Sequence, residues 1–80
     1  MEKHIDNLIK QELKKLSPYS EFTDNTDIIK DCGLDSLDIV EIYMNIEKEL
    51  DIHVSDEEIS NCGTKIKDIK AMIMNHLNRE

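Results

Sequence analysis

Ser36 is the residue in this sequence with the clearest chemical potential. It lies in the run DCGLDSLD (residues 31–38), where a long polar connection meets an amphipathic pattern of helical period. A catalytic serine would need a positioned base, and the histidines, His4, His53 and His76, lie in other segments. The glycines of a nucleophile elbow are also missing around the serine. We therefore expect no enzyme nucleophile here, whereas a phosphate-linked group would suit the free amides and the dipole of a helix N-terminus.

The helix expected after Ser36 carries two apolar faces. Asp35 is the predicted N-cap, and Asp38 places negative charge in the first turn, where the helix dipole favours it. With successive residues about 100° apart, the stripe that would face a core consists of Ile39, Ile42, Tyr43, Ile46 and Leu50. The opposite side holds a second set, here called the apolar strip, which consists of Leu37, Val40 and Met44, with Asp38, Glu41 and Glu47 along its edges. This arrangement predicts a docking face for a partner that offers an apolar contact ringed by Lys or Arg.

Negative charge is concentrated in the middle of the chain. The 80 residues hold 10 Lys and Arg against 18 Asp and Glu, a formal charge of −8. Residues 30–60 carry −8 by themselves, and the net charges of the segments before and after them cancel. This balance argues against nucleic acid and anionic membranes as partners, since phosphate binding depends on Lys and Arg. No apolar run approaches the ~18–20 residues that span a bilayer, and the N-terminus lacks a signal-peptide pattern. We therefore expect a cytoplasmic protein without a membrane span.

Neither disulfide nor metal chemistry is indicated by the sequence. Cys32 and Cys62 are too few for a disulfide framework and match no zinc spacing, so we expect two buried free thiols. The acids at Asp51 and at 56–58 lack the ligand spacing and the central glycine of an EF-hand loop. No metal site is therefore expected.

Three further helices are predicted by apolar residues of helical period. Residues 3–16 form the first, which ends at Ser17 because Pro18 cannot continue the hydrogen-bond ladder. Ser55 opens a short helix with a capping-box sequence that ends near residues 61–63. Thr64 is the predicted cap of a last helix, whose apolar face consists of Ile66, Ile69, Met72, Ile73 and Leu77.

A long connection separates the first two helices. Residues 18–35 contain Phe22, Ile28, Ile29 and Leu34, and a loop of this length is usually functional or held down by its own apolar residues. Sustained alternation of apolar and polar residues is missing, so no strands are expected. The predicted fold is an all-α, small four-helix bundle with three main helices, one short helix and a long loop between the first two. It would form a single domain over residues 1–80 and act as a monomer.

The order of these features resembles the acyl carrier proteins over nearly the full length. The match consists of a helix, a long loop, GLDSLD (33–38), an acidic helix, SDEE (55–58) and a last helix. By this resemblance, Ser36 would receive 4′-phosphopantetheine from coenzyme A through a phosphopantetheinyl transferase, with Asp35 beside the attachment point. The thiol of this arm would carry acyl groups as thioesters to acyl-transferring and acyl-modifying enzymes with basic patches. The chain itself would be a carrier and not an enzyme.

The resemblance also assigns roles along the second helix and in the core. The surface that partner enzymes recognise would consist of Asp35, Leu37, Asp38, Val40, Glu41 and Met44, and the helical wheel adds Glu47 to it. Candidate walls for a sheltered acyl chain, besides the core stripe of the second helix, are Ile28, Leu34, Ile59, Ile66, Ile69 and Ile73.

The pathway and one alternative function stay open at this point. The sequence departs from the commonest fatty-acid pattern at Cys32, Tyr43 and Leu50, and its last helix is more basic than usual. The cargo could therefore belong to fatty acid synthesis or to a specialised pathway that makes a polyketide, a modified sugar or an aminoacyl product. The alternative is an unmodified acidic helical adaptor that binds a basic protein through the same apolar strip.

Overall fold

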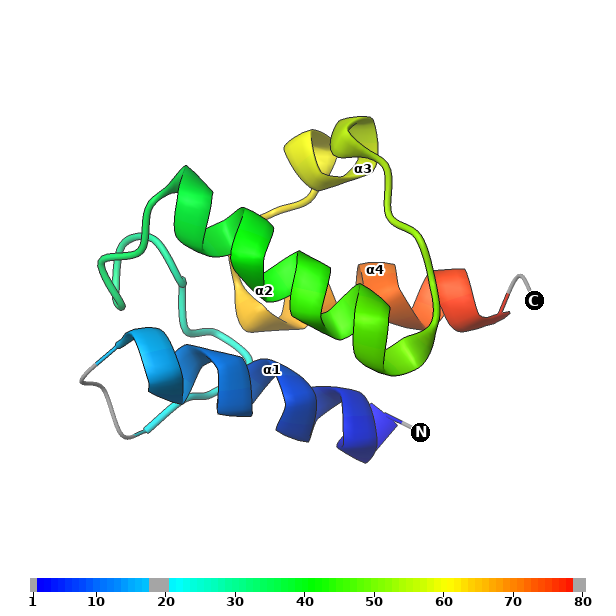
Figure 1. The fold of residues 1–80 in the computed structure, drawn as a ribbon. Helices are drawn as coiled ribbons and strands as arrows, with labels where there is room; N and C mark the ends of the chain where they lie inside the picture. The colour runs from blue at the N-terminus through cyan, green and yellow to red at the C-terminus, as the bar shows by residue number, and fades with distance from the viewer. Residues whose placement is uncertain (1, 18–20, 79–80) are drawn as a thin grey trace.

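The computed structural model describes residues 2–17 and 21–78, and its regular structure is helical. The four helices are α1 (Glu2–Leu16), α2 (Ser36–Leu50), α3 (Asp56–Asn61) and α4 (Ile66–Asn78). Figure 1 shows α1 and α2 running in opposite directions, with the short α3 on the far side of α2 from α1. The described residues contain no strand, only an isolated bridge between Asp27 and Lys65. The predicted all-α bundle with three main helices and one short helix is therefore confirmed.

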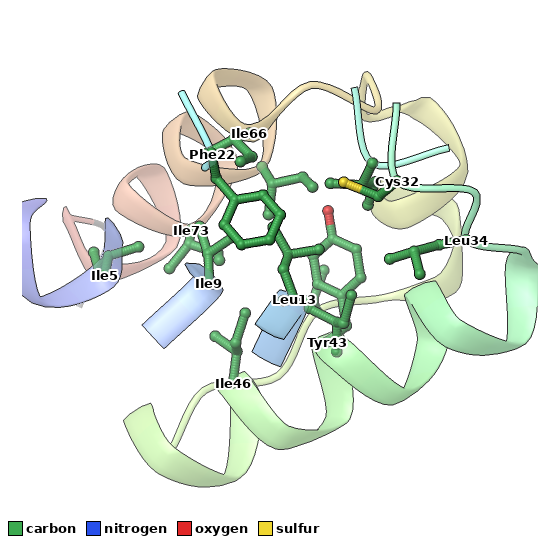
Figure 2. Packing of buried hydrophobic residues seen from close by; sticks show 14 of the residues in the cluster. Ile5, Ile9, Leu13, Phe22, Cys32, Leu34, Tyr43, Ile46, Ile66 and Ile73 are labelled. Carbon is green, nitrogen blue, oxygen red and sulfur yellow. The ribbon is translucent and has the colours of Figure 1, made fainter. Parts of the chain in front are cut away.

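The hydrophobic core lies between α1, α2 and α4. Helix α1 packs against both α2 and α4, and Figure 2 shows side chains from all three helices meeting in one cluster. The largest fully buried side chains are Ile5, Ile9, Leu13, Ile28, Ile42, Ile46, Ile66, Ile69 and Ile73. Of the predicted core stripe of α2, Ile42, Tyr43 and Ile46 are buried, whereas Ile39 and Leu50 are half-buried at its edge.

The loop between α1 and α2 is anchored by its own apolar residues and by one aspartate. Phe22, Ile28 and Leu34 are buried in the core, as the sequence predicts for a loop of this length, whereas Ile29 is exposed. The buried carboxylate of Asp27 accepts hydrogen bonds from the backbone N–H groups of Ile29 at 2.9 Å and Lys30 at 3.0 Å. These bonds hold the turn that leads toward the start of α2.

The predicted cap at Thr64 is wrong. Helix α4 begins at Ile66, and the hydroxyl of Thr64 donates instead to the Asp27 carboxylate at 2.9 Å. The amides at the start of α4 are satisfied by the long loop, because the N–H of Ile66 donates to the carbonyl of Thr26 and the N–H of Lys67 to that of Asp24, each at 3.0 Å. A side-chain cap is therefore replaced by backbone carbonyls of a segment that is distant in the sequence.

Helix α3 begins as its sequence predicts. Ser55 is the N-cap, and its hydroxyl accepts the N–H of Glu58 at 3.2 Å. Both cysteines are free thiols, with Cys32 buried and Cys62 half-buried. Across residues 2–17 and 21–78, no helix has the length and apolar character needed to cross a membrane.

Candidate functional site at the start of helix α2

Asp35 is the N-cap of α2, directly before its first residue. Its backbone is extended, with φ −108° and ψ −177°, and its carboxylate accepts the N–H of Asp38 at 3.0 Å. The Asp38 carboxylate accepts the N–H of Asp35 in return at 3.2 Å, which completes a capping box. The predicted cap is therefore confirmed, and two of the free amides at this helix end are satisfied by aspartates on either side of Ser36.

The Ser36 side chain is exposed at the first position of α2. Because Asp35 provides the cap, the Ser36 hydroxyl is not used for capping, and no residue within 2–17 or 21–78 hydrogen-bonds it. The preceding turn fixes its position, since Gly33 adopts a left-handed φ of 72° and Leu34 is buried in the core. A hydroxyl that is free and positioned at a helix N-terminus suits a phosphodiester, which the helix dipole stabilises.

The predicted apolar strip lies on the surface. Leu37 is 80% exposed, Met44 is 63% exposed and Val40 is 44% exposed, although all three belong to a helix whose other side is buried. Leaving three large apolar side chains in water on one helix face is unfavourable, and such patches commonly mark interaction sites.

The acidic side chains along this strip differ in their exposure and in their hydrogen bonds. Glu41 is exposed, and Asp38 is half-buried within the capping box. Glu47 is mostly covered and faces the loop after α2, where its carboxylate accepts the N–H of Val54 at 3.1 Å and lies 3.3 Å from Nδ1 of His53. The structure therefore places Glu41 as a freely accessible acid beside the strip and joins Glu47 to the loop.

A cleft of about 450 Å³ opens between α2 and α3, with Ser36 among its lining residues. Its apolar walls are formed by Ile28, Ile39, Val40, Ile59 and Ile69, and its polar lining includes Tyr43, Asp56, Ser60, Cys62 and Thr64. The predicted wall residues that line it are Ile28, Ile39, Tyr43, Ile59 and Ile69, of which Ile28, Tyr43 and Ile69 are also part of the buried core. The predicted wall residues Leu34, Ile66 and Ile73 are buried in the core and do not line the cleft. The position of Cys62 in this cleft is not predictable from the sequence, because no sequence pattern indicates where the α3–α4 connection folds back.

Two polar groups in this cleft are hydrogen-bonded to each other. The Tyr43 hydroxyl donates to Sγ of Cys62 at 3.5 Å, and Sγ of Cys62 donates to the carbonyl of Asp68 at 3.5 Å. Burial raises the pKa of both the Tyr43 phenol and the Cys62 thiol. Both groups are therefore protonated near neutral pH, and neither provides an activated nucleophile.

The described residues contain no cluster of three or more His, Cys, Asp or Glu side chains that could hold a metal ion. On α2, Asp38 and Glu41 lie beside the apolar strip, whereas Glu47 is hydrogen-bonded to the loop after the helix. This arrangement suits a protein partner with a basic surface.

Comparison with known proteins identifies the class. A family model described as a phosphopantetheine attachment site matches residues 3–73. The chain is 44% identical over 55 residues to an acyl carrier protein of Clostridium acetobutylicum, and the aligned segment covers 65% of this chain and 71% of that protein. It is 41% identical over 69 residues to an acyl carrier protein of Buchnera aphidicola subsp. Acyrthosiphon pisum, and the aligned segment covers 84% of this chain and 86% of that protein.

The fold and the matched family define a small helical carrier domain that bears a phosphopantetheine group. More specifically, the chain belongs to the acyl carrier protein family, and its cofactor is 4′-phosphopantetheine. The start of α2 fits such a group, because a phosphate there would meet the positive end of the helix dipole and a cleft opens directly beside it.

Proposed function

We propose that Ser36 carries the 4′-phosphopantetheine arm and that the chain presents acyl intermediates to enzymes of fatty acid or related polyketide and specialised biosynthesis. The observation that carries this proposal is the free, exposed Ser36 hydroxyl at the start of a helix that is capped by Asp35 instead. When bound, the group supplies a thiol that holds an acyl chain as a thioester. Ser36 anchors this arm, and Asp35 keeps the helix end in place beside the phosphate.

The apolar strip is the proposed recognition surface. Leu37, Val40 and Met44 would bury their exposed side chains against a partner enzyme, while Asp38 and Glu41 would meet its basic residues. Glu47 would contribute at the far end of the strip, where its carboxylate also holds the next loop. A phosphopantetheinyl transferase and the acyl-handling enzymes would use this surface in turn, because each must reach the same serine.

The chain acts as a cytoplasmic carrier and not as a catalyst in this proposal. The Tyr43 phenol is buried, the Cys62 thiol is half-buried, and both are protonated. Ser36 has no histidine or carboxylate hydrogen-bonded to it within the described residues. The cleft beside Ser36 would shelter the acyl chain between encounters, since four isoleucines and one valine contribute to its walls.

Substitution of single serines tests the attachment. Wild-type chain, Ser36→Ala and Ser60→Ala are each incubated with coenzyme A and a phosphopantetheinyl transferase of broad specificity, and the intact mass is measured. Ser60 is the matched control, because it is also an exposed serine that lines the cleft. We expect one adduct on wild type and on Ser60→Ala and none on Ser36→Ala. An adduct that persists in Ser36→Ala would overturn the proposal.

The exposed apolar strip also supports the second candidate, an unmodified acidic adaptor for a basic protein. The two functions differ in what Ser36 does. An adaptor would accept no phosphopantetheine and would bind its partner equally well after Ser36→Ala, whereas a carrier is modified and loses its cargo in that variant.

A further inference from the structure

The Tyr43 hydroxyl is a buried donor with a weak partner. Tyr43 is 2% exposed, and Figure 2 shows its ring reaching from α2 into the cluster of buried side chains. Its hydroxyl donates to Sγ of Cys62 at 3.5 Å. Sulfur is a weak hydrogen-bond acceptor, whereas a buried tyrosine hydroxyl usually finds a stronger one. A stronger acceptor that entered the cleft would therefore gain this donor.

The donor lies in the wall of the same cleft that Ser36 lines. The apolar part of this wall includes Ile39, Ile59 and Ile69. An arm attached at Ser36 would therefore bring its acyl chain to isoleucines and to the Tyr43 phenol. Of the other polar lining residues, Asp56 and Ser60 are exposed, and the Thr64 hydroxyl already donates to Asp27. Burial raises the pKa of Tyr43, so the hydroxyl stays protonated and able to donate.

We propose that this cleft favours acyl chains that carry a hydroxyl or keto oxygen along the chain, and that Tyr43 is the residue that determines this preference. The inference rests on the proposed attachment at Ser36. The oxygen of the cargo replaces Sγ of Cys62 as the acceptor of the Tyr43 hydroxyl, while the thiol keeps its bond to the carbonyl of Asp68. The remainder of the chain lies against the isoleucines, and no covalent bond forms or breaks.

The selectivity follows from the cost of burying an oxygen without a partner. A cargo oxygen that enters an aliphatic cleft loses its hydrogen bonds to water, and only a donor in the wall compensates this loss. A saturated chain carries no oxygen along its length, so it loses no hydrogen bonds to water when it enters the cleft. It also leaves the Tyr43–Cys62 hydrogen bond in place. Removing the Tyr43 hydroxyl should therefore weaken the shelter of oxygenated cargo and leave saturated cargo nearly unaffected.

A comparison of two proteins and matched cargoes tests this preference. Wild type and Tyr43→Phe, both carrying the arm, are loaded with octanoyl or with octanoyl that bears a hydroxyl on its third, fifth or seventh carbon. Cleavage of the thioester by hydroxylamine is slower when the chain is sheltered in the cleft. The ratio of the variant rate to the wild-type rate, taken for each cargo, cancels the different intrinsic reactivity of the thioesters.

For at least one hydroxyl position we expect Tyr43→Phe to speed cleavage by about three- to tenfold, the effect of one lost hydrogen bond. The octanoyl ratio should stay within about twofold, because the phenylalanine keeps the aromatic wall. Equal ratios for octanoyl and for all three hydroxylated chains would overturn the inference. Failure of both proteins to accept the arm would instead overturn the proposed attachment, so the two outcomes are distinguishable.

A measurement on the wild-type chain avoids any dependence on how Tyr43→Phe folds. The chemical shift of the Tyr43 ring carbon that bears the hydroxyl reports the partner of that hydroxyl. We expect this shift to change more with the best-sheltered hydroxylated cargo than with octanoyl. The same shift for both cargoes would contradict a hydrogen bond between Tyr43 and the cargo.

Discussion

Asp35 and Asp38 exchange hydrogen bonds across the first turn of α2, each carboxylate accepting the backbone N–H of the other at 3.0 and 3.2 Å. Ser36 lies between them, and its hydroxyl is not used to cap the helix. A serine is itself a good N-cap, so this division of roles is not required by helix formation. It leaves a free hydroxyl on a rigid helix end, which is what attachment of an arm at this position needs.

The division of roles predicts how α2 responds to substitution of its cap. Asp35→Ala should lower the free energy of unfolding by about 1 kcal/mol, because the N–H of Asp38 loses its acceptor. Asp35→Ser should lower the free energy of unfolding by only about 0.3 kcal/mol, since serine is a comparable cap. Urea unfolding followed by circular dichroism measures both. Equal stability of the alanine and serine variants would show that the capping bond contributes nothing.

A buried lysine joins α1, the long loop and α4. Nζ of Lys70 lies 2.8 Å from Asp24, 3.2 Å from Asp6 and 4.0 Å from Glu2, and its side chain is only 11% exposed. The carboxylates of Asp24 and Asp6 raise the pKa of Lys70. Hydrogen bonds from Lys10 and Lys70 in turn hold the pKa of Asp6 below its ordinary value. The cluster therefore stabilises the charged forms of Lys70 and Asp6.

These shifts set a pH window for the contribution of the cluster to stability. The lowered pKa of Asp6 means that its contribution is present above about pH 4 and is lost as the pH falls through its folded-state value. The raised pKa of Lys70 means that its contribution is present below about pH 10 and is lost as the pH rises through its folded-state value. The cluster should therefore act at full strength between these limits.

Lys70→Met tests this window. We expect it to lower the free energy of unfolding by about 1–3 kcal/mol near neutral pH, because two close carboxylates lose their cation. The difference from wild type should shrink below about pH 4 and above about pH 10. Lys67→Met is the control, since Lys67 is an exposed lysine on the same helix, and it should change stability little. A difference that is constant from acid to alkaline pH would indicate a packing effect without a charge contribution.

Reversal of one charge tests the recognition surface. Glu41→Lys should slow modification by the transferase about three- to tenfold at low salt and flatten the dependence of the rate on salt. Glu49→Lys makes the same change in net charge at an exposed position of α2 that lines a groove toward α1. We expect this control to have a much smaller effect. If both variants slow modification equally, the rate depends on the net charge of the chain and not on an acid beside the apolar strip.

Much of α2 could be predicted from the sequence because its determinants are local. The Asp35 cap and the three exposed residues of the apolar strip follow from one helical period and one capping preference. The same holds for the Ser55 cap of α3. Ser36 could be singled out for the same reason, since a serine at a predicted helix start is recognisable without tertiary structure.

The features that sequence reasoning missed depend on contacts between distant segments. The Thr64 hydroxyl was expected to cap a helix, but the fold brings Asp27 within hydrogen-bond distance of it. The bond between Tyr43 and Cys62 likewise joins α2 to the α3–α4 connection. Helical periodicity places a residue on one face of its own helix, and it contains no information on which loop will cover that face.

The attachment of the arm to Ser36 is the central claim, and locating the adduct on the wild-type chain tests it most directly. The chain is modified with coenzyme A and a phosphopantetheinyl transferase, and fragmentation mass spectrometry assigns the added group to a residue. We predict a single phosphopantetheine on Ser36. An unmodified chain under conditions that modify a known carrier, or an adduct on any other residue, would contradict the account.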